Sequence, residues 1–133
     1  MASPTPVEVF QVALAAMQAG DVPALLAQCT DDIVFEFPFA PAGRPARVTG
    51  KDALGEYMTP IFGRAAFERA DLVTHQTVDP DVVVIEMTAF GHTHAGEPFT
   101  RPYIMVLTVR DGLIARYRDY WAPSGGPAPR AAA

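Results

Sequence analysis

The residue best placed for chemistry in this chain is Asp119, which stands between two aromatic residues. It belongs to residues 112–123, a segment that opens with an Asp-Gly turn signal and stops at a proline, as a bounded β-strand does. Strand alternation gives this segment an apolar, aromatic face and a more basic one. The first face carries Leu113, Ala115, Tyr117, Asp119 and Trp121, and the second carries Ile114, Arg116, Arg118 and Tyr120.

Two interpretations of Asp119 follow from this setting. Burial among rings penalises the charged form of a carboxyl, so the pKa of Asp119 would rise from ~3.9 to ~6. A carboxylic acid that is protonated near neutral pH can donate to an epoxide, a carbonyl or an imine. The alternatives are a structural ion pair with Arg101 or Arg118, which would lower the pKa, and a solvated rim position. We favour the catalytic interpretation.

A second candidate acid, Glu86, lies alone in the β-branched run at residues 82–91. If its face of the strand lines a cavity, Glu86 joins Asp119, and two carboxyls with separate pKa values would supply an acid and a base. That face could equally be the exterior of the sheet, in solvent or at a dimer contact. His75, on the preceding predicted strand, could assist as a pocket-wall residue or lie on the surface.

Two histidines and a nearby acid occur in the connection at residues 92–98. His92, His94 and Glu97 resemble part of a metal-binding set, but no further downstream histidine completes it. We therefore expect solvated hairpin histidines, no metal and no cofactor. The single cysteine, Cys29, has no evident histidine partner that would make it a nucleophile. No phosphate-binding glycine loop is present.

Aromatic, sulfur-containing and cationic residues are the expected substrate contacts. Core packing is the alternative role for each of them, and in a cone-shaped fold the two roles overlap. Arg101, or Arg44 in a loop, could hold an anionic group of the substrate; for these two lone arginines the alternative is a solvated position. The predicted set is Phe35, Phe37, Tyr57, Arg101, Tyr103, Met105, Tyr117 and Trp121.

Three helices and a series of strands must position these side chains. Thr5 and Glu8 form a capping-box signature, and Gly20 ends the helix that follows. Asp21 caps a second, short helix with Leu25, Leu26 and Cys29 facing inward, and a third helix is expected at about 51–63. Its buried stripe would be Ala53, Leu54, Tyr57, Met58, Ile61 and Phe62.

The predicted strands follow the helices in the chain, which indicates an α+β fold. The first is residues 33–39, with Ile33, Phe35, Phe37 and Phe39 on one face, and it leads into a Pro/Gly/Ala loop at 40–50. The later strands are expected at 67–78, 82–91, 99–110 and 112–121. We expect one domain over residues 1–123, with a cavity between sheet and helices, and a disordered tail at 124–133.

Composition excludes several classes of function. A formal net charge of -5 and the lack of a Lys/Arg run argue against a nucleic-acid partner. One cysteine allows no disulfide within the chain. No apolar run reaches membrane-spanning length, and the first residues lack the features of a signal peptide. We therefore expect a cytoplasmic protein without a membrane partner.

The order of several short motifs resembles the NTF2-like superfamily. The motifs are Ala19-Gly20-Asp21, Thr30-Asp31-Asp32-Ile33-Val34-Phe35, Gly50-Lys51-Asp52-Ala53-Leu54, Arg110-Asp111-Gly112-Leu113-Ile114 and Arg118-Asp119-Tyr120-Trp121-Ala122-Pro123. The chain is most similar to the SnoaL-like polyketide cyclases and the phenazine-biosynthesis PhzA/PhzB-like members, with ketosteroid isomerase as a cousin. The resemblance implies a cone-shaped α+β barrel, a curved, mostly antiparallel sheet around N-terminal helices, a deep apolar pocket and a homodimer.

The resemblance also marks where this chain departs from ketosteroid isomerase. By alignment, Phe37 stands where that enzyme has its base, Ala13 near its oxyanion-hole tyrosine and Met105 near its protonated acid. None of the three side chains can perform those roles. In the SnoaL-like and phenazine groups, an acid reaching the pocket from the last strand resembles Asp119.

These observations together predict a cofactor-independent enzyme for a small apolar or aromatic metabolite. It would catalyse isomerisation, cyclisation or condensation by acid/base chemistry, with Asp119 as the acid and Glu86 or His75 assisting. One alternative is a non-catalytic ligand-binding or dimerisation domain. A further alternative is an epoxide hydrolase or epoxide-opening cyclase, whose Asp–Arg–Asp set cannot be assembled from this sequence.

Overall fold

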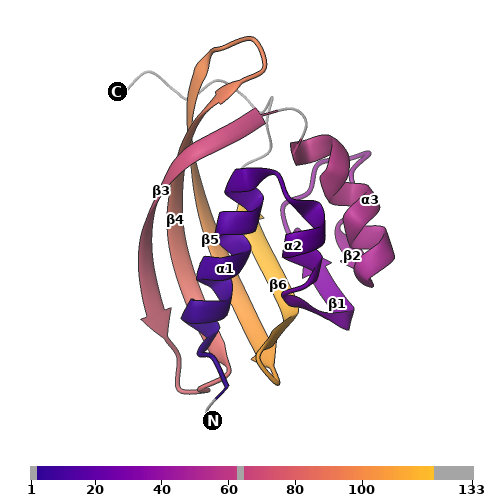
Figure 1. The fold of residues 1–133 in the computed structure, drawn as a ribbon, viewed down its shortest axis with the longest axis vertical. Coiled ribbons are helices and arrows are strands. Elements are labelled where there is room, and N and C mark those ends of the chain that lie inside the picture. Colours follow the sequence, from indigo (N-terminus) through magenta and orange to yellow (C-terminus); the bar gives the residue numbers. More distant parts are fainter. Residues whose placement is uncertain (1–2, 63–64, 122–133) are drawn as a thin grey trace.

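Three helices lie against one face of a curved, six-stranded sheet in the computed structural model of this chain (Figure 1). The structure describes residues 3–62 and 65–121, so the predicted tail lies outside it. The helices are α1 (Pro6–Ala19), α2 (Val22–Leu26) and α3 (Lys51–Phe62). The strands are β1 (Cys29–Glu36), β2 (Arg47–Thr49), β3 (Ala65–Gln76), β4 (Val82–Thr93), β5 (Pro98–Arg110) and β6 (Leu113–Trp121).

The strand order over the described residues is β2-β1-β6-β5-β4-β3. Every neighbouring pair is antiparallel except β1 and β6, which run parallel. The sheet does not close into a barrel, and β2 and β3 form its two edges. The predicted α+β arrangement with a curved, mostly antiparallel sheet is confirmed.

Local capping signals set the positions of the first two helices, as predicted. The Thr5 hydroxyl accepts a hydrogen bond from the backbone of Glu8, and the Glu8 carboxylate accepts one from the backbone of Thr5. Gly20 ends α1 with φ of 69°, a left-handed conformation that favours glycine. The Asp21 side chain then caps α2 by accepting from the backbone of Ala24.

The first strand begins earlier and ends earlier than predicted. Cys29 is buried, but it opens β1 and does not extend α2. Ile33, Phe35 and Phe37 face the core as predicted, whereas Phe39 is 61% exposed. The chain turns after Phe37, with the backbone of Ala40 donating to the Phe37 carbonyl oxygen at 3.0 Å. This turn breaks the alternation, so the prediction for Phe39 is wrong. The 40–50 loop also contains the short strand β2.

A bulge changes the predicted faces of β6. Val109 pairs with Ile114, but Thr108 pairs with Arg116, so one extra residue enters β6 at this point. Ile114 therefore faces inward and is fully buried, and its predicted outward position is wrong. The predicted inward direction of Tyr117, Asp119 and Trp121 beyond the bulge is confirmed, because all three line the same cavity.

Aromatic rings connect β1, β6 and α1 beneath that cavity. The rings of Phe35 and Tyr117 are stacked, with centroids 4.3 Å apart and planes 9° from parallel. Phe10 of α1 lies against the same tyrosine, with ring centroids 6.5 Å apart. Such pairs add to the stabilisation that burial alone provides. This packing fixes β6 two residues before Asp119.

On the outer side of β1 and β6, Glu36 forms ion pairs with three arginines. Its side chain is only 14% exposed and contacts Arg47 of β2 together with Arg116 and Arg118 of β6. The hydrogen bond from Arg116 is the main cause that lowers the pKa of Glu36 to about 2; Arg47 and Arg118 also lower it, and burial opposes them. The cluster ties the short edge strand and the last strand to β1.

We predict that Glu36→Gln lowers the free energy of unfolding by about 1–2 kcal/mol at pH 7, because it removes charge-assisted hydrogen bonds from three strands. The folded pKa of about 2 lies below the ordinary 4.5. This stabilisation is therefore present above pH 4.5 and is lost as the pH falls towards 2. Urea unfolding at pH 7 and pH 3 should show the deficit shrinking at the lower pH. Glu56→Gln, at an exposed α3 position, is the control. An equal deficit at both pH values would contradict the prediction.

Candidate active site

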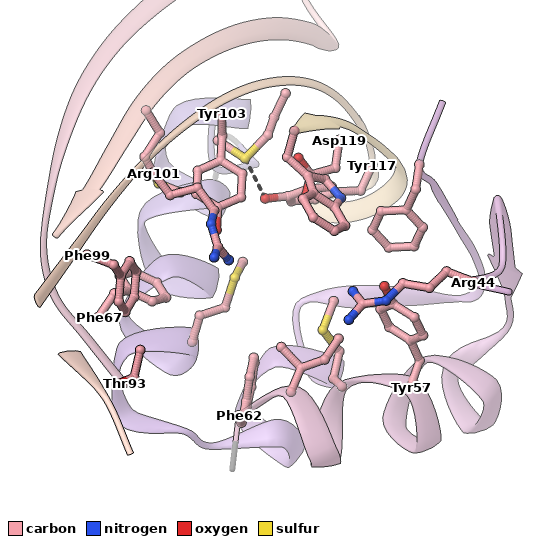
Figure 2. A pocket seen from close by; sticks show the side chains of 17 residues that line it. Arg44, Tyr57, Phe62, Phe67, Thr93, Phe99, Arg101, Tyr103, Tyr117 and Asp119 are labelled. Carbon is pink, nitrogen blue, oxygen red and sulfur yellow. Dashed lines mark hydrogen bonds between the residues drawn. The ribbon is translucent and has the colours of Figure 1, made fainter. Parts of the chain in front are cut away.

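A cavity of about 430 Å³ lies between the sheet and helices α1 and α3 (Figure 2). Strand alternation on β4, β5 and β6 and the inner faces of the helices supply its walls. Aromatic, aliphatic and sulfur-containing side chains dominate the lining, which is the usual character of a small-molecule site. The lining residues are Met17, Phe37, Arg44, Tyr57, Met58, Ile61, Phe62, Phe67, Met87, Thr93, Phe99, Arg101, Tyr103, Met105, Tyr117, Asp119 and Trp121.

Asp119 is the one carboxylic acid among these lining residues. It follows Tyr117 on the inner face of β6 and pairs with Met105 of β5. Its Oδ1 atom is buried and makes no hydrogen bond to any described residue. The structure also shows no ion pair between Asp119 and Arg101, while Arg118 contacts Glu36. The structural ion pair considered from the sequence is therefore not formed.

Burial sets the proton affinity of this carboxyl. Loss of hydration raises the pKa of Asp119 from 3.8 to about 7, which agrees in sign with the sequence prediction and is somewhat larger. Both the acid and the carboxylate are consequently present near neutral pH. A group in this range can donate a proton in one step and accept one in another.

Three tyrosines line the cavity as neutral phenols. Burial is the largest cause that raises the pKa of Tyr57, Tyr103 and Tyr117, and the nearby Asp119 charge acts in the same direction. The Tyr117 hydroxyl donates to Met105 Sδ at 2.7 Å (Figure 2). The lining thus contains neutral hydroxyl donors beside the acid.

Two arginines extend into the same space from different elements. Figure 2 shows Arg101 of β5 and Arg44 of the β1–β2 loop pointing towards the cavity interior. The guanidinium of Arg101 lies 5.4 Å from the ring centroid of Phe99, and that of Arg44 lies 5.7 Å from the centroid of Trp121. The cavity therefore combines aromatic walls with two cationic groups.

The structure brings together seven of the eight predicted substrate contacts: Phe37, Tyr57, Arg101, Tyr103, Met105, Tyr117 and Trp121. The exception, Phe35, lies behind Tyr117 in the core and does not reach the cavity. Among the lining residues, sequence reasoning had assigned Met58, Ile61 and Phe62 to packing of the third helix only. It missed Met17, Phe67, Met87, Thr93 and Phe99. Alternation along β4 would have identified Met87 only if the inward face of that strand had been known.

Glu86 and His75, the predicted catalytic assistants, do not line the cavity. Val83, Ile85 and Met87 are the buried residues of this part of β4, so Glu86 lies on the outer face of the sheet. Its Oε2 atom is 2.6 Å from His75 Nε2, and both side chains are about half exposed. Their assistance at Asp119 does not fit this geometry, because the thickness of the sheet separates them from the cavity.

The first of the hairpin histidines pairs with an acid of the neighbouring strand. His92 Nδ1 lies 2.7 Å from Glu68 Oε1, on neighbouring strands. Within residues 3–62 and 65–121, no three His, Cys, Asp or Glu side chains are grouped as metal ligands. Over the same residues, no helix has the length and apolarity needed to span a membrane.

Cys29 is buried, and burial raises the pKa of its thiol to about 11. The reactive thiolate is therefore scarce near neutral pH.

Comparisons with known proteins agree with this geometry. Residues 10–117 match the family described as SnoaL-like domain. A PhzA/B-like protein of uncharacterized function from Pseudomonas aeruginosa is 35% identical over 68% of this chain and 64% of its own length. The chain thus spans less than two thirds of the curated relatives it matches.

Solved structures are similar over more of the chain. One from Bacillus subtilis, provisionally named an isomerase, has a TM-score of 0.84 at 32% identity and covers 89% of this chain and 86% of its own. The Δ5-3-ketosteroid isomerase of a Mycobacterium species has a TM-score of 0.77 at 26% identity, covering 90% and 95%. These scores show that the neighbours share the fold of this chain.

We predict that Asp119→Asn makes the protein more stable than wild type at pH 8, by roughly 2–4 kcal/mol at about 1.4 kcal/mol per pKa unit. The unfolded carboxyl ionises near 3.8 and the folded one near 7. Between these values the folded state retains a proton that the unfolded state has lost, so wild-type stability falls as the pH rises. Urea unfolding from pH 4 to pH 8 should show this fall in wild type and in Asp31→Asn, whose side chain is exposed. Lower stability of Asp119→Asn at pH 8 would contradict the account.

Proposed function

Because the chain belongs to the SnoaL-like domain family, we propose that it is a cofactor-independent enzyme acting on a small apolar or aromatic metabolite. The cavity would bind this compound, and Asp119 would transfer protons to and from it. The reaction class is isomerisation, cyclisation or condensation, since each of these can proceed through proton transfer beside a carbonyl group.

The observation that carries this proposal is a single buried carboxyl in an apolar cavity with a pKa of about 7. The ionised form can remove an acidic proton from carbon beside a substrate carbonyl. The neutral form that results can return the proton at another carbon or donate it to the developing oxygen anion. The neutral phenols of Tyr57 and Tyr103, in the same lining, can stabilise that oxygen by hydrogen bonding.

The position of Asp119 supports this role. It pairs directly with Met105, the residue that aligns near the protonated acid of ketosteroid isomerase. The carboxyl thus stands on the adjacent strand, one cross-strand position away. Phe37, which aligns with the base of that enzyme, lines the same cavity but has no proton to transfer. A single carboxyl would have to serve as both acid and base here.

A non-catalytic ligand-binding domain is the second candidate, favoured by the same apolar lining. A cavity with Asp119 and Glu86 together would favour an enzyme, and a cavity lined only by apolar groups would favour a binder. This cavity has Asp119 without Glu86, together with Arg44 and Arg101. Burying a carboxyl there lowers the stability of the fold, and a role of the carboxyl in proton transfer to a ligand would account for that loss.

We predict that the protein accelerates hydrogen–deuterium exchange at C1 of 2-tetralone, a bicyclic ketone used here as a general probe of proton abstraction. Asp119→Asn should reduce the exchange by roughly 10²-fold, the usual contribution of a positioned acid or base. Proton NMR in deuterated buffer at pH 7 measures the rate. Glu86→Gln is the matched control, because it makes the same carboxyl-to-amide change on the outer face of the sheet.

Two results would contradict the enzymatic proposal. Exchange that persists in Asp119→Asn would assign the chemistry to another group. Exchange no faster than in buffer, with 2-tetralone binding shown by calorimetry, would favour the binding domain.

We also propose that the chain forms a homodimer through the outer face of the sheet. Val73, Glu86, Ile104 and Tyr120 lie in one row across β3, β4, β5 and β6. Val73 is 55% exposed and Ile104 is 47% exposed, and apolar side chains on a sheet face gain from cover. Ile114, which strand alternation had placed on the same face of residues 112–123 as Tyr120, is buried and does not belong to this row.

We predict that Ile104→Arg shifts a micromolar dimer to monomer in sedimentation velocity, because the guanidinium would be buried at the contact. Val12→Arg is the control, since Val12 is an exposed apolar residue on α1. A wild-type monomer, or a dimer unaffected by Ile104→Arg, would refute this interface.

A further inference from the structure

The two arginines of the cavity differ from every other cation that the structure describes. Each of the others lies 3.9 Å or less from a carboxylate oxygen: Arg47, Lys51, Arg69, Arg110, Arg116 and Arg118. Arg44 and Arg101 have no carboxylate partner among residues 3–62 and 65–121. In the described part of the chain, the other cations are thus paired with carboxylates, whereas the two in the cavity have no such partner.

The surroundings of these two arginines favour an anion supplied from outside. Each guanidinium lies over an aromatic ring and is hydrogen-bonded to a tyrosine of the lining, Arg44 to Tyr57 and Arg101 to Tyr103. A guanidinium has five N–H donors, so further donors of each arginine remain for a ligand. Figure 2 shows both side chains directed at the shared interior, with Asp119 on the wall beyond them. Near neutral pH a large share of Asp119 is uncharged, so the lining has a positive excess. Arg101 is half-buried and Arg44 is exposed, and a ligand anion in the cavity would form charge-assisted hydrogen bonds with both guanidinium groups.

We propose that the cavity takes a small aromatic or alicyclic carboxylate, with Arg101 and Arg44 holding its carboxylate group and the aromatic side chains holding its ring. A planar carboxylate matches the planar donor fork of a guanidinium. The walls formed by Phe37, Tyr57 and Trp121 suit a flat hydrocarbon body, and about 430 Å³ accommodates one of two rings. This inference rests on the proposed function and specifies its substrate class.

Naphthalene-2-carboxylate and its neutral carboxamide provide the test, because they differ in charge and hardly in shape. Binding is measured by calorimetry at pH 6, where Asp119 is mostly neutral and the ligand is ionised. Wild type should bind the carboxylate at least roughly tenfold more tightly than the amide, the worth of a charge-assisted contact. Arg101→Met and Arg44→Met should each reduce this preference, and the double variant should abolish it while retaining amide binding.

Arg69→Met is the matched control. Arg69 also lies over an aromatic ring, that of Phe90 at 4.0 Å, but it contacts Asp71 and does not line the cavity. Its variant should keep the full preference for the carboxylate. Circular dichroism of all variants checks that the fold is retained.

Three outcomes would overturn the inference: equal binding of acid and amide by wild type, an undiminished preference in the double variant, or no binding of either compound at millimolar concentration. None of these measures turnover. A carboxylate preference without any exchange of 2-tetralone protons would uphold the inference on the ligand and count against the enzyme. Exchange of 2-tetralone protons without a preference for the carboxylate would support the enzyme and count against the inference on the ligand.

Discussion

The exclusion of water from one carboxyl is the constraint on which this account depends. Asp119 is held on the inner face of β6 because Tyr117, two residues earlier, is stacked on Phe35 and packed against Phe10. This aromatic packing fixes the direction of the strand, and alternation then directs Asp119 into the cavity. Burial of this carboxyl destabilises its charged form relative to water. As a result, the carboxyl exchanges protons near neutral pH.

Charge is divided between the two sides of the sheet. On the outer side, Glu36 binds three arginines of neighbouring strands, and Glu86 contacts His75, so the carboxylates there have side-chain partners within the sheet. On the inner side, apolar walls surround one acid and two arginines that the chain itself does not pair. The outer pairs hold strands together, whereas the inner charges form the site that we propose for a ligand.

Local patterns in the sequence predicted the elements and most of the cavity. Capping residues located the first helix, and alternation in β6 identified Asp119 and Trp121 as inward-facing, whereas Tyr103 was predicted as a substrate contact from its residue type. Alternation failed where the chain departs from regular geometry: a bulge at the start of β6 turned Ile114 inward, and a turn exposed Phe39. The face of β4 that carries Glu86 could not be predicted, because both faces of that strand are rich in apolar residues and only its packing against the helices decides.

The central claim is that burial places the proton affinity of Asp119 near neutral pH, and the most direct measurement is a carbon-13 NMR titration of its carboxyl in the folded protein. Comparison of wild type with Asp119→Asn assigns the signal. The account predicts an apparent pKa near 7. A pKa at or below the ordinary 3.8 would show a hydrated or ion-paired carboxylate, and it would remove the physical basis for acid/base chemistry in this cavity.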